Sequence, residues 1–149
     1  VDDAGQAKVS FTASLLPPEK AEPDRPYLLA TDWPLVVPVN KTVKLIVTSD
    51  PAGIIHSWTV PSFGLKIDAI PGRLNEDWFR VTQVGTYFGE CSELCGKDHA
   101  FMPIEVNVVS DADYNAWAEK VETASVEEAR DFLFALRKAR GQANTLAQN

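Results

Sequence analysis

The amino-acid sequence predicts an all-β fold, a Greek-key β-sandwich or barrel, followed by a C-terminal helical extension. Within residues 1–109, short apolar or alternating runs are separated by turn signals such as Asp50-Pro51-Ala52-Gly53 and Pro71-Gly72. After Ser110 the apolar residues recur at helical spacing instead. We therefore predict a β domain over residues 1–109 and a helical extension with a polar tail over residues 110–149.

Eight segments of the first part are predicted to be strands. The first, Lys8 to Leu16, alternates apolar and polar residues and stops at Pro17-Pro18, and the charged stretch 18–26 is predicted to be a loop. The other seven are Tyr27–Ala30, Leu35–Val39, Thr42–Ser49, Ile54–Val60, Trp78–Val84, Thr86–Gly89 and Ile104–Val109. Short strands at this spacing are typical of sandwiches and barrels.

Two helices are predicted after residue 109. Ser110 with Asp113 and Ser125 with Glu128 have the spacing of a helix N-terminal capping box. The apolar positions that follow are Tyr114, Trp117, Ala118 and Val121 in the first helix, and Phe132, Leu133 and Leu136 in the second. We expect Trp117 and Phe132 to pack in a core. Arg137, Lys138 and Arg140 would favour the dipole in the last turn, and Gly141 would end the helix.

Composition and charge exclude some classes of protein. A hydrophobic fraction of 45% allows a packed core. No apolar run approaches the roughly 18 residues that cross a bilayer, and Val1-Asp2-Asp3 lacks the features of a signal peptide. We expect a processed or excised soluble piece. The net charge of −7 argues against nucleic acid as a partner and suits a basic protein, although many soluble proteins are acidic.

Sulfur and imidazole donors are concentrated in one stretch of the chain. The sequence has two cysteines, two histidines and one methionine. Four of them lie within twelve residues, namely Cys91, Cys95, His99 and Met102, and the fifth is His56 in an apolar run. Because no other residue of these types exists in the chain, all of them can belong to a single metal site.

The donor types favour copper over other metals. Mg²⁺ and Ca²⁺ prefer oxygen donors, and zinc sites rarely use methionine and space their ligands as paired knuckles. Thiolate, imidazole and thioether donors together suit copper that cycles between Cu(I) and Cu(II). A single blue copper would need only one cysteine. Two cysteines fit better as bridges between two copper ions, with one imidazole on each and Met102 as a weak extra ligand.

Each of these residues also has an interpretation that involves no metal. A Cys91–Cys95 disulfide would close a short, strained loop and add little stability. His56 alone would fit a core histidine, and Met102 alone would fit a packing residue. Gly89 and Gly96 make a continuous helix improbable, so we expect a ligand loop between two strands, followed by Pro103.

Two runs of the sequence resemble the CuA region of cytochrome c oxidase subunit II. One is Cys91-Ser92-Glu93-Leu94-Cys95-Gly96-Lys97-Asp98-His99-Ala100-Phe101-Met102-Pro103-Ile104, with its C-x₃-C-x₃-H-x₂-M spacing. The other extends from His56 to Asn75 and includes Pro71-Gly72-Arg73-Leu74-Asn75. The likeness covers roughly residues 27–109 and implies a cupredoxin fold.

The resemblance implies an electron-transfer function and assigns roles to individual residues. Cys91 and Cys95 would bridge two copper ions, His56 and His99 would each bind one, and Met102 would be the weak sulfur ligand. Glu93 would offer its backbone carbonyl to copper, and its carboxylate would help to hold Mg²⁺ at the interface with subunit I. The resemblance assigns no catalytic residue to the chain.

The family context implies partners and a location. Electrons would come from cytochrome c and pass to haem in subunit I, where oxygen is reduced, and residues 67–75 would face that subunit. The implied location is the periplasmic side of the bacterial inner membrane, with membrane attachment only through an N-terminal anchor absent from this sequence.

The sequence departs from the family in three respects. Asp98 stands beside His99, where family members often carry a neutral residue. The transmembrane hairpin and the aromatic segment that includes the electron-entry tryptophan are missing. The C-terminal helices are not part of the core motif. Two alternatives remain: the CuA domain of a nitrous-oxide reductase, against which the Pro71–Asn75 run argues, and a copper-delivery protein.

Overall fold

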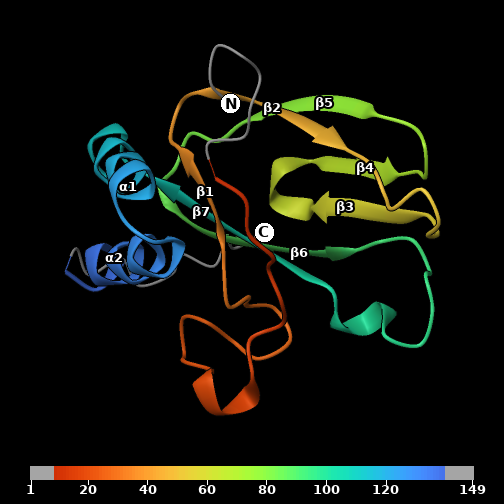
Figure 1. The fold of residues 1–149 in the computed structure, drawn as a ribbon, viewed down its shortest axis with the longest axis horizontal. Coiled ribbons are helices and arrows are strands. Elements are labelled where there is room, and N and C mark those ends of the chain that lie inside the picture. Colours follow the sequence, from red (N-terminus) through yellow and green to blue (C-terminus); the bar gives the residue numbers. More distant parts are fainter. Residues whose placement is uncertain (1–8, 140–149) are drawn as a thin grey trace.

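The computed structural model describes residues 9–139. Its strands are β1 (Leu35–Pro38), β2 (Thr42–Val47), β3 (His56–Val60), β4 (Leu65–Ala69), β5 (Asn75–Arg80), β6 (Gly85–Cys91) and β7 (Pro103–Val109). Its helices are α1 (Asp111–Thr123) and α2 (Val126–Ala139), with short 3₁₀ turns η1 (Pro18–Lys20), η2 (Pro61–Phe63) and η3 (His99–Phe101). These elements confirm the predicted β architecture with a helical extension (Figure 1).

The strands form a five-stranded sheet in the order β1-β7-β6-β3-β4 and a separate ribbon of β2 and β5. β1 runs parallel to β7, and the other pairings are antiparallel. The main core lies among the strands of both sheets and contains Val37, Val60, Leu65, Phe79, Tyr87, Val106 and Val108. The larger sheet therefore curls around an apolar centre.

The two faces of β1 and β7 pack against different partners. Val37 and Val108 belong to the main core, whereas Val36 and Val109 pack with Trp117 of α1 and Leu133 of α2 in a second apolar cluster. Successive side chains of a strand point to opposite faces, so both faces of these strands are covered. Figure 1 shows the helices together at the side of the sheet where β1 and β7 lie.

Both helices begin at the capping boxes that the sequence predicts. The Ser110 hydroxyl oxygen accepts a hydrogen bond from the backbone N–H of Asp113 at 3.1 Å. The Ser125 backbone N–H donates to the Glu128 carboxylate at 2.9 Å, and the Ser125 hydroxyl accepts from the Glu128 N–H at 3.2 Å. Trp117 is buried and Phe132 packs against its cluster, which confirms the expected packing role.

Two predicted strands at the start of the described chain are wrong. Residues 9–16 contain only a single bridge, Leu15 to Thr31, and Tyr27–Ala30 lies in a turn. Leu28 in that turn has a positive φ of 75°. Alternation alone does not provide a neighbouring strand, and this segment crosses the domain without a continuous ladder.

Other strand boundaries differ from the predicted ones because pairing with a neighbouring strand outweighs the local pattern of apolar residues. β4 was not predicted as a strand, although it pairs with β3 over its whole length from Val60↔Leu65 to His56↔Ala69. β5 begins at Asn75 rather than Trp78 because its first residues pair with β2. Arg137 and Lys138 lie in the last turn of α2 as expected, and the side chain of Arg137 is in addition buried. The expectations for Arg140 and Gly141 lie outside the described residues.

Candidate metal centre

The five sulfur and imidazole donors come from three places in the fold. His56 is the first residue of β3 and Cys91 is the last of β6. Cys95, His99 and Met102 follow in the ligand loop, which we define as residues 91–102 and which joins β6 to β7. In the ladder between β3 and β6, Trp58 lies opposite Cys91. This pairing brings the distant His56 to the end of the strand that carries Cys91.

Gly89 makes that strand pairing possible. A Cβ atom at this position would overlap the backbone carbonyl oxygen of Thr59 on β3. Only glycine lets the two backbones approach so closely here. The position of His56 relative to Cys91 therefore depends on a glycine two residues before the first cysteine.

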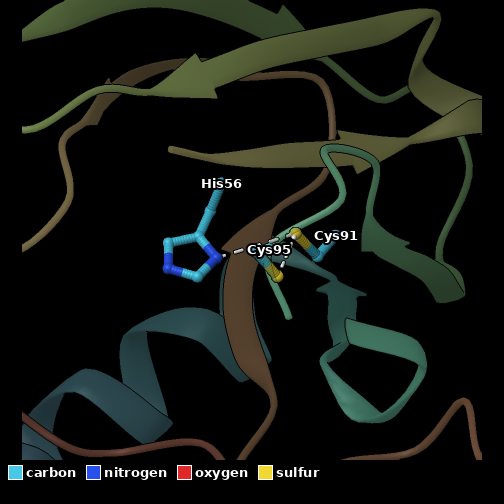
Figure 2. A group of neighbouring side chains, drawn as sticks. All are labelled: His56, Cys91 and Cys95. Carbon is cyan, nitrogen blue, oxygen red and sulfur yellow. Dashed lines mark hydrogen bonds between the residues drawn. The ribbon is translucent and has the colours of Figure 1, made fainter. Parts of the chain in front are cut away.

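The donor atoms form a continuous chain of short contacts. The Sγ atoms of Cys91 and Cys95 lie 3.8 Å apart. Cys91 Sγ is 3.9 Å from His56 Nδ1, and Cys95 Sγ is 3.3 Å from His99 Nδ1. Figure 2 shows the His56 ring and the two thiols converging from separate elements. Each thiol is thus close to a different imidazole.

Two further donors complete the arrangement. Met102 Sδ lies 3.4 Å from Cys95 Sγ, and the backbone carbonyl oxygen of Glu93 lies 3.4 Å from Cys91 Sγ. All six residues singled out in the sequence therefore lie at one place. The backbone carbonyl oxygen of Glu93 faces the thiols, and the residue as a whole is half-buried.

The ligand loop is held by backbone hydrogen bonds and by one unusual glycine. The N–H of Cys91 donates to the carbonyl of Met102 at 3.2 Å, which closes the base of the loop, and the N–H of Ser92 donates to Ser57 on β3 at 3.1 Å. Gly96 has a φ of 134°, and the only helical turn in this loop is η3. The expectation of a loop in place of a continuous helix is confirmed.

Burial and charge affect the acid–base properties of the site. Cys91 is buried and Cys95 is half-buried, and both are free thiols. Loss of hydration raises the pKa of the Cys95 thiol, and its hydrogen bond and charge interaction with Cys91 raise it further. Partial burial also raises the pKa of Glu90, and the nearby charge of His99 opposes this shift.

Two features of the site were not anticipated from the sequence. His99 lies close enough to oppose the burial-induced rise in the pKa of Glu90, although in sequence Glu90 is only a charged residue before a cysteine. A cavity of about 550 Å³ borders the donors, and its lining includes His56, Cys91 and Met102 together with residues 13–15. Because residues 13–15 are far from the metal ligands in sequence, no local pattern predicts that they line the same cavity.

The donor set fits copper. Two thiols, two imidazoles, one thioether and one carbonyl oxygen lie within a few ångströms of one another. The polar atoms closest to each thiol are nitrogen, sulfur or carbonyl oxygen atoms. Soft and borderline donors of these types select copper rather than Mg²⁺ or Ca²⁺. The described fold with this cluster defines a cupredoxin-like domain with a candidate copper site.

The chain belongs to the cytochrome c oxidase subunit II family. A family model described as cytochrome c oxidase subunit II, periplasmic domain, matches residues 2–109. Cytochrome c oxidase subunit 2 of Cereibacter sphaeroides is 57% identical over 101 residues, which cover 68% of this chain and 33% of that protein. A probable subunit 2 of Rickettsia bellii is 47% identical over 109 residues, covering 73% and 40%.

Solved structures agree with this assignment. The periplasmic domain of subunit II of cytochrome oxidase (CoxB) of Bradyrhizobium japonicum is 50% identical, with a TM-score of 0.66, covering 74% of this chain and 75% of that chain. A second structure is a mixed disulfide intermediate between the thioredoxin-like protein TlpAs(C110S) and subunit II (CoxBPD, C233S). Its match has 47% identity and a TM-score of 0.61, covering 76% of this chain and 75% of that chain.

The chain spans about a third of the length of the curated relatives that it matches, from 33% to 40% for the first two. Within residues 9–139, no helix is long and apolar enough to cross a membrane.

Proposed function

We propose that this chain carries electrons through a dinuclear copper centre of the CuA type. His56, Cys91, Cys95, His99 and Met102 would hold the metal through their side chains, and Glu93 through its backbone carbonyl. The observation that carries the proposal is the paired arrangement of the thiols: they lie 3.8 Å apart, and each has its own imidazole. A mononuclear site would leave one thiol without a function.

The scaffold suits a redox site. When bound, copper would supply a one-electron redox couple. His56 and Cys91 are fixed to the paired strands β3 and β6, and the backbone hydrogen bond from Cys91 to Met102 closes the ligand loop that joins β6 to β7. Ligands held in this way keep nearly the same geometry in both oxidation states, which lowers the reorganisation energy of electron transfer. A copper-delivery protein would need ligands that release the metal.

For the whole protein, we propose the role of subunit II in cytochrome c oxidase. Electrons would enter from cytochrome c and leave to haem in subunit I, which would carry out the enzymatic reduction of oxygen. The location would be the periplasmic side of the bacterial inner membrane, with attachment through an N-terminal anchor. The acidic chain, with a net charge of −7, would favour a basic donor protein through electrostatic steering.

Two finer assignments accompany this proposal. The Glu93 carboxylate would contribute to a Mg²⁺ site at the interface with subunit I, while its carbonyl oxygen faces the thiols. Residues 1–109 would form the copper domain, and residues 110–149 would form a helical extension and tail, of which α1 and α2 pack on β1 and β7.

Copper loading followed by electron paramagnetic resonance tests the proposal. We expect two copper ions per chain and a hyperfine pattern from one unpaired electron shared by two equivalent nuclei. A single copper with a four-line pattern would refute the dinuclear centre. Slow release of copper to a chelator would support a resident redox site, whereas rapid release would favour the delivery function.

We also propose that Cys91 and Cys95 exchange with a thioredoxin-like protein before copper binds. Their Sγ atoms lie 3.8 Å apart, so the two residues can form a disulfide after a small rearrangement, and disulfide sulfurs cannot act as thiolate ligands. A thiolate of the partner would attack one sulfur of that disulfide and form a mixed disulfide. The partner's second thiol would then displace the mixed disulfide, leaving two cysteine thiols here and a disulfide in the partner.

A reduction assay tests this exchange. The oxidised chain should bind copper only after incubation with a reduced thioredoxin-like protein, and a partner variant without its second cysteine should be trapped on Cys91 or Cys95. Thiol titration measures the reduction directly. If the oxidised chain takes up copper without reduction, the exchange step is unnecessary.

A further inference from the structure

A buried carboxylate outside the ligand set contacts both the segment that precedes β1 and the helix α2. The Glu105 side chain on β7 is 0% exposed. It accepts a hydrogen bond from the Thr31 backbone N–H at 2.8 Å. Arg137 Nη1 lies 3.4 Å and Arg25 Nη2 lies 3.6 Å from its carboxylate oxygens. We call Asp24, Arg25, Glu105 and Arg137 the charge cluster.

The helical extension supplies one cation of the charge cluster. Arg137 is on α2, is only 7% exposed, and also pairs with Asp24 at 3.3 Å. Arg25 lies 4.3 Å from the ring centroid of Phe134 on the same helix. A buried carboxylate without a cation is strongly unfavourable. Docking of α2 therefore stabilises the negative charge of Glu105 in the β domain.

From Glu105, hydrogen bonds continue to the cavity beside the metal ligands. Thr31 forms an antiparallel bridge with Leu15. Its neighbour Asp32 accepts from the Ser14 N–H at 2.7 Å through its carboxylate and donates its own N–H to the Ser14 carbonyl at 2.9 Å. Residues 13–15 line the same cavity as His56, Cys91 and Met102. We call residues 13–15 the cavity wall.

We propose that Glu105 is a positioning residue for the metal site, and that α2 controls access to Cys91 through it. Glu105 fixes Thr31, Thr31 and Asp32 fix the cavity wall, and Arg137 makes the buried carboxylate tolerable. When α2 is displaced, the cavity wall loosens and the Cys91 thiol becomes accessible to copper or to a partner thiol. The importance of Cys91 rests on the proposed function, but the gating itself concerns the metal-free chain.

Thiol reactivity in the metal-free chain tests the gating. In a Cys95→Ser background, Cys91 is the only thiol in the sequence, so its reaction with a bulky aromatic disulfide reagent can be followed alone. We expect Arg137→Met and Glu105→Gln to raise the rate several-fold. Lys138→Met is the matched control, because it removes the same charge from an exposed neighbouring position of α2 and should leave the rate unchanged.

A second comparison separates gating from general loss of stability. Val43→Ala on β2 weakens the main core away from the charge cluster. At equal stability, measured by urea unfolding, it should increase the Cys91 rate less than Arg137→Met does. Hydrogen exchange should accelerate at residues 14–16 and 31 in Arg137→Met but not in Val43→Ala. Arg137→Lys keeps the cation and should restore much of the protection.

Asp32→Ala keeps the test decisive if the charge-cluster variants do not fold. It removes only the exposed side-chain hydrogen bond to Ser14 and should also raise the Cys91 rate. The proposal is overturned if Asp32→Ala and any folded charge-cluster variant react no faster than Lys138→Met. Failure of copper to bind as a pair would leave all of these rates unaffected, so the two proposals fail independently.

Discussion

Gly89 of β6 passes so close to Thr59 of β3 that no side chain fits between them, because a Cβ atom would overlap the Thr59 carbonyl oxygen. This contact sets the distance between the two strands that deliver His56 and Cys91. The geometry of the candidate copper site thus depends on a residue that contributes no donor atom.

Gly89→Ala should weaken both the fold and the metal site. The added methyl group meets backbone rather than a movable side chain, so the strands must separate, at a cost of about 3 kcal/mol in the free energy of unfolding. Urea unfolding measures that loss, and copper titration should show reduced binding. Unchanged stability together with full copper loading would mean that the strands adapt without cost.

Cys91→Ser and Cys95→Ser should each abolish the signal of the shared electron. A serine hydroxyl is a harder donor than a thiolate and is not expected to bridge two copper ions. Copper stoichiometry and electron paramagnetic resonance of the loaded variants measure the effect. Because the sulfurs lie 3.8 Å apart and contact different imidazoles, we expect both variants to fail. Survival of the signal in either one would contradict bridging.

Met102→Leu should retain copper but raise the reduction potential. The thioether lies 3.4 Å from Cys95 Sγ, and it would add electron density that favours the oxidised metal. Removal of this weak donor should shift the potential by tens of millivolts, since about 59 mV corresponds to a tenfold change in the affinity ratio of the two oxidation states. Redox titration measures it. Complete loss of metal would show that Met102 is a strong ligand.

Glu105→Ala should be far more destabilising than Glu76→Ala. Removal of the buried Glu105 leaves Arg137 without the fully buried one of its two carboxylate partners, which costs about 3–5 kcal/mol. Glu76 pairs with Lys44 at a shorter 2.9 Å, but both side chains are more than half exposed, so that loss should be below about 1 kcal/mol. Urea unfolding of the two variants provides the comparison, and equal losses would rule out a special role for burial.

The capping box of α2 should give stability that depends on pH. Hydrogen bonds from the backbone N–H and then the hydroxyl of Ser125 lower the pKa of Glu128 below its usual 4.5. A lowered pKa in the folded state means that the ionised carboxylate stabilises the fold above pH 4.5, and that this contribution disappears as the pH falls through the folded-state pKa.

Glu128→Gln tests the sign of this effect. The variant should be less stable than the parent near pH 7, and the difference should shrink as the solution is acidified to about pH 3. Urea unfolding across this range measures it. A difference that grows on acidification would contradict the capping interaction seen at Ser125.

Local chemistry determined much of what could be predicted. The spacing from Cys91 to Met102 and the donor types predicted a copper site from the sequence alone, because four of the five donors lie within a single loop. The capping boxes at Ser110 and Ser125 predicted both helix starts, since each cap involves residues only three positions apart. The turns at proline and glycine could be predicted for the same reason, since they too depend on residues close together in sequence.

Tertiary structure decided the rest. Strand β4 exists because it pairs with β3, and residues 9–16 form no ladder because they lack such a partner, although their alternation suggested one. Thirty-five residues separate His56 from Cys91, and only the pairing of β3 with β6 joins them. Glu105 and Arg137 are ordinary charged residues in sequence. Their burial together arises from the docking of α2, and contacts between residues so far apart leave no local pattern to read.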